Sequence, residues 1–284
     1  MAINSHYPSM IAQLTEMITL LAQTELMSRF QMGLTWGAKR DGSIVTDADR
    51  AMQQGLQVAL AQQWPHIGFL GEEMDEIEQR RILMPAGAMG AHDGSQNAYW
   101  CLDPLDGTTN FAAGIPFFSV SLALIENGQV SLGVIYDPVR EECFSAYRGG
   151  SVSLNGKPPA DAPELDNPTV LSEMIAVVDL KRLPKPLAIN IAAQHPFRSQ
   201  RNFGSCALEW CWLAMQRFQL YLHGGQKLWD YAAGRLILET ASGVVSTIDG
   251  QAEFQISLDA QPVIAATNQQ HYQRWYDWVA ANKS

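Results

Sequence analysis

Apolar residues recur at helical spacing in two stretches near the start of the chain. Between residues 8 and 32 they include Leu14 and Ile18, and this pattern predicts an amphipathic helix. A second helical pattern covers residues 52–63. The stretch HIGFLGEE, at residues 66–73, is short and apolar and ends in a glycine and two acids, so we interpret it as a strand.

Strand-like patterns dominate the middle of the chain. AYWCLDPLDG, at residues 98–107, predicts a strand that runs into a turn. Successive strands are predicted over residues 117–157, with a hairpin turn at Asn127 and Gly128. Residues 74–98 are polar and rich in glycine, and we expect an exposed, mobile loop there.

Beyond about residue 150, the two kinds of pattern alternate. We interpret residues 174–180 and 186–193 as strands, and residues 205–218 and 230–243 as helices. Such alternation is typical of an α/β fold. We therefore predict an α/β protein organised as two parts, an N-terminal α+β half (residues 1–150) and a C-terminal α/β half (residues 151–284).

Composition and charge narrow the classes of function. The chain has 284 residues, of which 47% are hydrophobic and 17% charged, as expected for a globular protein. Its net charge of −10 argues against nucleic acid as a partner, and no apolar run approaches the ~20 residues of a membrane span. The four cysteines lack a CxxC pair, and the N-terminus shows no signal-peptide pattern, so we expect free thiols and a cytoplasmic location.

The stretch that carries chemistry begins with Asp103, Pro104, Leu105 and Asp106. Pro104 has a restricted backbone and biases Asp103 toward an extended conformation, so both carboxylates can converge on one point at little cost in order. The carbonyl of Leu105 would add another oxygen. Such oxygens suit Mg²⁺, Ca²⁺ or Mn²⁺ rather than zinc. The alternative is an ordinary Asp-Pro turn that carries surface acids.

Gly107 and the threonines that follow favour the metal interpretation. Glycine lets a ligand approach the backbone closely, and a helix that starts here would present free N–H groups to a phosphate. Glu72 and Glu73, at the end of a predicted strand, could complete the site, as could Asp230 at the start of a predicted helix. Taken singly, each of these three acids is explained more simply by a structural role than by catalysis; Asp230, for example, would be favourable in a first helical turn even with no function.

Together, these motifs resemble the inositol monophosphatase family, within the superfamily of lithium-sensitive, magnesium-dependent phosphomonoesterases. The signature of that group is an Asp, then Glu-Glu, then Asp-Pro-Ile/Leu-Asp-Gly/Ser-Thr, then Trp-Asp with Gly-Gly eleven residues later. The matching residues of this chain follow the same order: Asp49, Glu72, Glu73, Asp103 to Thr108, Trp229, Asp230, Ser242 and Gly243.

The resemblance implies a set of metal ligands. Glu72, Asp103 and the carbonyl of Leu105 would bind a first Mg²⁺. Asp103, Asp106 and Asp230 would bind a second, and a third, weaker ion would lie on Glu72. Ca²⁺ or Mn²⁺ could substitute for Mg²⁺, and Li⁺ is expected to inhibit. Most of these ligands lie in the N-terminal half, and Asp230 comes from the C-terminal half.

The resemblance also implies how phosphate and water would be held. The backbone amides of Gly107 and Thr108 would bind the phosphate, and Thr108 and Asp49 would orient the attacking water. We count Asp49, Glu72 and Thr108 as the catalytic residues. Asp47 is an alternative to Asp49, because the stretch VTDAD offers both acids.

The substrate side departs from the family pattern. Inositol phosphatases typically carry a Glu seven residues before the Trp-Asp aspartate, and this chain has His223 there. We expect His223 to influence substrate choice, with the alternative that the loop 221–228 shifts and His223 faces solvent. Gly204, Ser205 and Asp230 are the other candidates for contacts with the substrate. Ser242 stands where the signature has glycine.

We therefore expect a Mg²⁺-dependent phosphomonoesterase that acts on a small phosphorylated polyol or sugar, with inositol monophosphate as the first candidate. The fold implied is a five-layer αβαβα sandwich of the inositol monophosphatase and fructose-1,6-bisphosphatase type, as a homodimer. The expected partner is a small-molecule phosphate ester, with neither nucleic acid nor membrane. Alternatives are a 3′(2′),5′-bisphosphate nucleotidase, a fructose-1,6-bisphosphatase, or a metal-binding relative that acts mainly as a protein partner.

Overall fold

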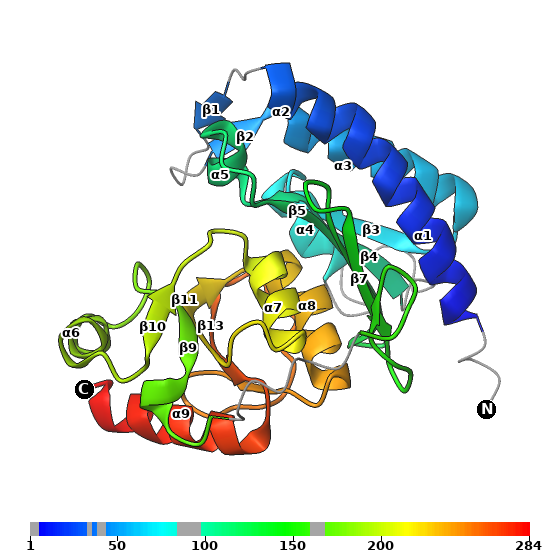
Figure 1. Ribbon diagram of the computed structural model, residues 1–284. Coiled ribbons are helices and arrows are strands. Elements are labelled where there is room, and N and C mark those ends of the chain that lie inside the picture. The colour runs from blue at the N-terminus through cyan, green and yellow to red at the C-terminus, as the bar shows by residue number, and fades with distance from the viewer. Residues whose placement is uncertain (1–5, 33–35, 39–43, 84–97, 160–167) are drawn as a thin grey trace.

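The described part of the chain forms five stacked layers. The computed structural model describes residues 6–32, 36–38, 44–83, 98–159 and 168–284. Helices α1 and α3 cover one face of a first sheet, α7 and α8 lie between this sheet and a second one, and α6 and α9 cover the far face of the second sheet (Figure 1). This order is the αβαβα sandwich that the family resemblance implies.

The first sheet has the strand order β3-β4-β5-β6-β7-β8. Only β3 and β4 pair in parallel within this order, and the other neighbours are antiparallel. The hairpin between β5 and β6 turns at Asn127 and Gly128, both with positive φ (50° and 78°), as the Asn-Gly pair predicts. The strands are β3 (Gly68–Gly71), β4 (Ala98–Asp106), β5 (Ser119–Glu126), β6 (Gln129–Asp137), β7 (Glu142–Tyr147) and β8 (Ser153–Leu154).

The outer helices of this sheet follow the predicted amphipathic patterns. Helix α1 (Tyr7–Leu21) continues through a π-helical segment (Ala22–Met27) into α2 (Ser28–Met32), and it buries Leu14 and Ile18. Helix α3 (Asp47–Gln63) starts at the predicted acids and is capped by Thr46. A short hairpin of β1 (Trp36–Ala38) and β2 (Ile44–Thr46) precedes it.

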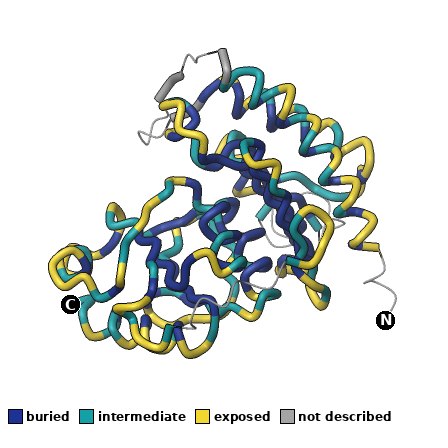
Figure 2. The backbone as a smooth tube through the Cα atoms, in the orientation of Figure 1, coloured by how far each residue is buried: buried dark blue, intermediate teal, exposed yellow. Residues whose placement is uncertain are grey.

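The second sheet has the order β10-β9-β11-β13-β12. Its inner helices, α7 (Cys206–Ala214) and α8 (Leu228–Thr240), are buried nearly all round, as Figure 2 shows. A helix that is apolar on all sides is typical of such a position between two sheets. The strands are β9 (Ile175–Asp179), β10 (Ser199–Arg201), β11 (Leu220–Gln226), β12 (Val244–Ser246) and β13 (Gln261–Ala266), and α9 (Gln269–Asn282) covers the outer face with α6.

Three expectations about local structure are wrong. Residues 186–193, predicted as a strand, lie in helix α6 (Lys185–Gln194). Leu187 and Ile191, one helical turn apart, are buried, whereas Ile189 is 65% exposed, so the apolar run in fact follows a helical period. The predicted loop 74–98 contains helix α4 (Glu76–Ile82), and residues 84–97 of that loop lie outside the described residues.

Helix α4 has signals that the glycine-rich context obscured. Asp75 caps its start, where the side chain accepts the N–H of Ile77 at 2.9 Å. Acids fill its first turn and Arg80 and Arg81 its last, which complements the helix dipole. The stretch 221–228 was predicted to be a loop, but most of it belongs to strand β11.

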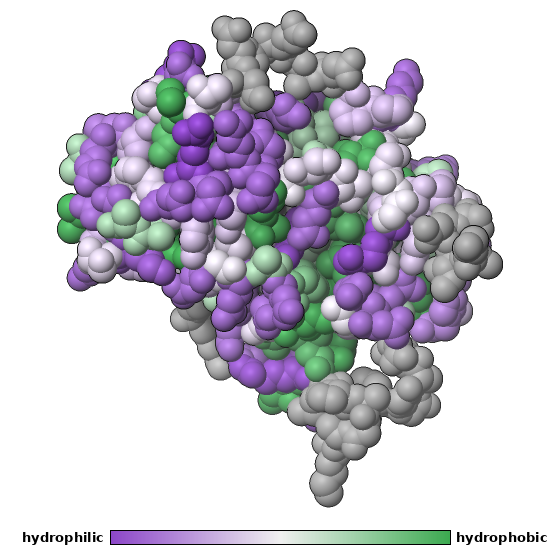
Figure 3. All heavy atoms as spheres, turned by 90° about the horizontal axis from the view of Figure 1, so that it is seen from below, coloured by the Kyte–Doolittle hydropathy of each residue, from purple (hydrophilic) through white to green (hydrophobic). Residues whose placement is uncertain are grey.

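The visible face of the molecule is mostly polar, as expected for a globular protein. Figure 3 shows one face on which hydrophilic residues predominate and hydrophobic areas are smaller. Among the described residues, no helix has both the length and the apolar character needed to cross a lipid bilayer.

Candidate active site

Asp103 and Asp106 lie at the end of β4, where the strand is irregular. Asp103 pairs with Ser121 and Asp106 with Ser119, so three steps along β4 correspond to two along β5. In a regular strand, residues three apart face opposite sides of the sheet. The extra residue, in the Pro104–Leu105 segment, therefore forms a bulge that lets both carboxylates face the same side.

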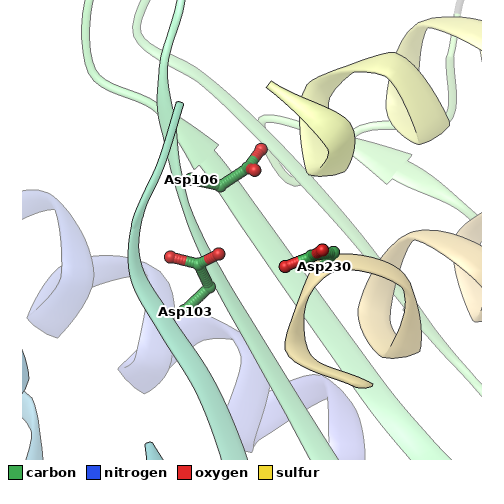
Figure 4. Close-up of side chains that lie close together, drawn as sticks. All are labelled: Asp103, Asp106 and Asp230. Atoms are coloured by element: carbon green, nitrogen blue, oxygen red, sulfur yellow. The ribbon is translucent and has the colours of Figure 1, made fainter. Parts of the chain in front are cut away.

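Asp230 approaches these two acids from the second half of the chain. It lies in the first turn of α8, and its carboxylate accepts the N–H of Lys227 at 2.8 Å. Ligand oxygens of Asp103, Asp106 and Asp230 all lie within 4.8 Å of one another (Figure 4). We call these three residues the acidic trio.

The electrostatics of the acidic trio fit a divalent cation. Burial raises the pKa of Asp103 well above its usual range, and the charges of Glu72, Asp106 and Asp230 raise it further. Burial likewise raises the pKa of Asp230, with added repulsion from Asp106 and Glu72. Buried carboxylates that repel one another need a counter-charge, and hard oxygen ligands suit Mg²⁺. The residues present therefore fit the implied metal.

Asp106 is held by the start of α7. Its carboxylate accepts hydrogen bonds from the Ser205 hydroxyl and from the N–H groups of Cys206 (3.2 Å) and Ala207 (2.8 Å). Burial raises the pKa of Asp106, and these hydrogen bonds oppose the rise. Ser205 thus touches a candidate metal ligand, while Gly204 shapes the turn before it with a φ of 82°.

Behind this turn lies a buried acid, Glu209, that the sequence reasoning missed. Its Oε1 accepts the N–H groups of Phe203 (2.9 Å) and Gly204 (3.1 Å), and its Oε2 accepts the hydroxyl of Tyr221 (3.0 Å). Burial raises the pKa of Glu209 to about 7. Glu209 therefore fixes the turn that leads to Ser205. An acid inside the otherwise apolar stretch SCALEWCWLA was the signal available in the sequence.

Gly107 and Thr108 begin a short helix, α5 (Thr108–Ala112), directly after the acids of β4. Gly107 has a φ of 92°, and a side chain there would meet the carbonyl oxygens of Gly204 and Phe117 at 3.1 Å. Only glycine fits such a position without strain. The N–H groups of the first helical turn have no acceptors within the helix, so they can bind an anion.

The Thr108 hydroxyl lies between Asp49 and the backbone of β4. Its Oγ1 is 3.1 Å from Asp49 Oδ1 and 2.9 Å from the carbonyl oxygen of Leu105, and its proton can be donated to either. Asp49 also accepts the N–H (2.7 Å) and hydroxyl (2.6 Å) of Thr46, and burial raises its pKa to about 6. Asp47 is exposed on α3. The geometry thus brings Asp49, rather than Asp47, to Thr108.

Glu72 follows β3 and lines a cleft beside Asp230. Its N–H donates to the carbonyl of Leu102 at 3.0 Å, and the amide of Gln79 donates to the carbonyls of Gly71 (2.8 Å) and Glu72 (3.1 Å). Helix α4, which carries the buried Gln79, therefore positions Glu72. The cleft has a volume of about 320 Å³ and is lined by one member of the acidic trio, Asp230.

His223 lies on β11 and is 7% exposed, so it does not face solvent. Its Nδ1 accepts the N–H of Gly225 at 3.1 Å, which assigns the proton of the neutral ring to Nε2. Nε2 lies 3.3 Å from Asp179 Oδ2 and 3.7 Å from Cys206 Sγ. The hydrogen bond with His223 lowers the pKa of Asp179. The structure thus places His223 beside the first residue of α7, held by a carboxylate from β9.

Residues 9–282 match the family model described as "Inositol monophosphatase family". The chain belongs to the inositol monophosphatase family. It is 32% identical over 213 residues to Nus factor SuhB of Pasteurella multocida, covering 75% of this chain and 74% of the relative. It is also 32% identical over 232 residues to inositol monophosphatase 1 of Solanum lycopersicum, covering 79% and 78%.

Solved structures of this family show the same fold. The SuhB protein of Bartonella henselae superposes with a TM-score of 0.79 at 26% identity, over 95% of this chain and 98% of that one. An IMPase/NADP phosphatase in complex with Mg²⁺ and phosphate gives a TM-score of 0.75 at 23% identity, over 96% and 95%. The match to the family model confirms the predicted family, and the similarity to these solved structures confirms the predicted fold.

Proposed function

We propose that this member of the inositol monophosphatase family is a Mg²⁺-dependent phosphomonoesterase for a small phosphorylated polyol or sugar, with inositol monophosphate as the reference substrate. One observation carries the proposal: Asp103 and Asp106, two members of the acidic trio, stand directly before the helical turn of Gly107 and Thr108. This arrangement offers metal ligands and phosphate-binding amides from consecutive residues of one strand and turn.

In this proposal, Glu72, Asp103 and the carbonyl of Leu105 would hold one Mg²⁺, and the acidic trio would hold a second, with a weaker third ion on Glu72. When bound, Mg²⁺ would activate water, shield the phosphate charge and stabilise the leaving oxygen. The bulge in β4 and the N–H groups of α7 keep Asp103 and Asp106 in place before an ion binds. Ca²⁺ or Mn²⁺ could substitute, and Li⁺ would inhibit.

Thr108 and Asp49 orient the attacking water. Asp49 accepts the hydroxyl proton of Thr108, so a lone pair of Thr108 Oγ1 can accept a hydrogen bond from water. Asp49 is held in turn by the backbone N–H and hydroxyl of Thr46. This chain needs no nucleophilic side chain, because positioned water attacks phosphorus directly.

The amides of Gly107 and Thr108 bind the phosphate and keep it in line with that water. The positive φ of Gly107 turns the chain sharply from β4 into α5, so these amides lie beside the acids. Donors fixed in advance stabilise the charge that develops on the phosphoryl oxygens without reorganisation. We also propose that residues 1–150 supply most metal ligands, and that residues 151–284 supply Asp230 and the substrate side.

The test is phosphate release from inositol 1-phosphate, fructose 1,6-bisphosphate and 3′-phosphoadenosine 5′-phosphate, with and without Mg²⁺. We expect turnover of at least one substrate, only with Mg²⁺. Thr108→Ala should lower kcat at least about a hundredfold, since it removes the group that orients the water. Thr109→Ala is the matched control, because Thr109 is exposed on the same helix. Equal effects of the two substitutions would contradict the assignment.

Several relatives carry the name Nus factor SuhB, so a role as a protein partner is the second candidate. This chain has an acid at every position where a side chain would bind metal. Their presence favours catalysis, because a relative without catalytic activity would be free to lose these acids. Failure to turn over any member of the substrate panel with Mg²⁺ would favour the second candidate. A homodimer and a cytoplasmic location are further proposals, from the family resemblance and the free cysteines respectively.

A further inference from the structure

Arg182 occupies a position that depends on two consecutive glycines of β11. A Cβ on Gly224 would lie 2.2 Å from the backbone carbonyl carbon of Arg182, and a Cβ on Gly225 would lie 3.3 Å from Arg182 Cδ. The strand is irregular here, with a register shift between His223 and Gln226. The backbone of Arg182 therefore packs directly on Gly224, and its side chain passes over Gly225.

Arg182 lines the cleft that also contains Asp230. Arg182 Nη1 donates to the carbonyl oxygen of Gly225 at 3.0 Å, and the side chain lines the cleft together with Lys227 and Asp230. Lys227 Nζ donates to the carbonyl oxygen of Leu258 at 2.7 Å. These contacts orient both cations and leave further N–H donors on each, since a guanidinium has five and an ammonium three.

The charges that line the cleft favour an anion on this side. Divalent cations would balance Glu72 and Asp230, and Glu76 pairs with Arg80. Arg182, Lys227 and Asp259 then remain, with a net charge of +1. A leaving group that carries hydroxyls alone would need no guanidinium, whereas the planar fork of arginine matches a phosphate in two parallel hydrogen bonds.

We propose that Arg182, assisted by Lys227, forms a subsite for a second phosphate group on the leaving alcohol, so that bisphosphorylated polyols or sugars are preferred over the matching monophosphates. This inference rests on the proposed phosphatase function of the same cleft. It assigns the choice of substrate to Arg182, whereas the ring of His223 faces Asp179.

Two matched substrate pairs test the subsite: inositol 1-phosphate with inositol 1,4-bisphosphate, and fructose 1-phosphate with fructose 1,6-bisphosphate. The variants are Arg182→Gln, Arg182→Lys and the control Lys181→Gln, which removes the same charge from the neighbouring exposed residue. In Arg182→Gln, the bisphosphate-to-monophosphate ratio of kcat/KM should fall about ten- to a hundredfold for at least one pair, mainly through KM. Arg182→Lys should retain part of the preference, and Lys181→Gln should change the ratio less than about twofold.

A binding measurement separates failure of the subsite from failure of the proposed function. Calorimetric titration of the same four compounds in the presence of Ca²⁺ gives dissociation constants, and a phosphate assay of the same samples checks that no compound is hydrolysed during the titration. Selective weakening of bisphosphate binding in Arg182→Gln supports the subsite even if no compound is hydrolysed, which would overturn only the phosphatase proposal. Equal effects of Arg182→Gln and Lys181→Gln in both pairs, or parent binding that is no tighter for bisphosphates, overturn the subsite.

Discussion

Asp103→Asn should make the metal-free protein more stable, although it replaces a buried charged residue. Asp103 is 2% exposed, and burial, together with the charges around it, raises its pKa well above the usual range. Asparagine keeps the acceptor for the N–H of Leu105, now 3.0 Å from Asp103 Oδ1, and its amide can donate to Asp106 or Asp230. The substitution therefore removes repulsion without leaving a buried group unsatisfied.

The size of this effect follows from the spacing of the acidic trio. Two unit charges separated by 4.8 Å repel by about 3.5 kcal/mol at an effective dielectric constant of about 20. Proton uptake relieves part of this repulsion in the parent, so we expect the free energy of unfolding in EDTA to rise by about 2–3 kcal/mol. In Mg²⁺ at a hundred times its dissociation constant, the parent should gain about 2.7 kcal/mol, and Asp103→Asn should lose most of this gain.

The assay is urea unfolding of parent and variant at neutral pH, in EDTA and in Mg²⁺. Asp47→Asn is the control, because it removes the same charge from an exposed position on α3 and should alter neither value by more than about 0.5 kcal/mol. Turnover by Asp103→Asn should fall at least about a hundredfold. A variant that is less stable than the parent in EDTA, or that keeps the full Mg²⁺ gain, would refute the metal assignment of Asp103.

Three further outcomes test other parts of the structure. Burial raises the pKa of Glu209 from 4.5 to about 7, so its contribution to stability is present at low pH and lost as pH rises through that range. The stability of Glu209→Gln relative to the parent should therefore increase by up to about 3 kcal/mol between pH 5 and pH 8, measured by urea unfolding, and a constant difference would contradict this. Ser242 has a φ of 68°, and Ser242→Gly should raise the free energy of unfolding by about 0.5–1 kcal/mol; a decrease would show that its side chain is needed. Li⁺ in the millimolar range should inhibit Mg²⁺-dependent phosphate release, with altered sensitivity in Asp230→Asn, and indifference to Li⁺ would count against the second metal position.

The candidate metal site could be read from the sequence because its main constraints are local. Pro104 restricts the chain between Asp103 and Asp106, and Gly107 provides the turn that follows, so residues adjacent in sequence define most of the geometry. The sequence spacing of Asp103 and Asp106 could not show that both carboxylates face the same side of the sheet. That depends on a bulge, which exists only because β5 pairs with β4 in this register.

Helix and strand were confused where a short apolar run was the only signal. Residues 186–193 alternate in a way that suits either element, and the packing of Leu187 and Ile191 against the second sheet decided for a helix. Residues 221–228 contain two glycines and resemble a loop, yet β11 forms there because β9 and β13 pair with it on both sides. Partners distant in sequence override weak local preference.

The sequence by itself determined the family and the layered α/β fold, and it predicted the residues that we propose to bind metal and phosphate, because a motif specifies chemistry and local backbone shape together. Only the tertiary structure decided which residues surround that chemistry. Glu209 reaches the turn before Ser205 through a helix, and Arg182 reaches the cleft because two glycines of a neighbouring strand leave space for it. Arg182 and Gly225 are 43 residues apart along the chain, and side-chain patterns within one segment carry no information about such a contact. The hydrogen bond from Tyr221 to Glu209 likewise comes from a separate element, strand β11.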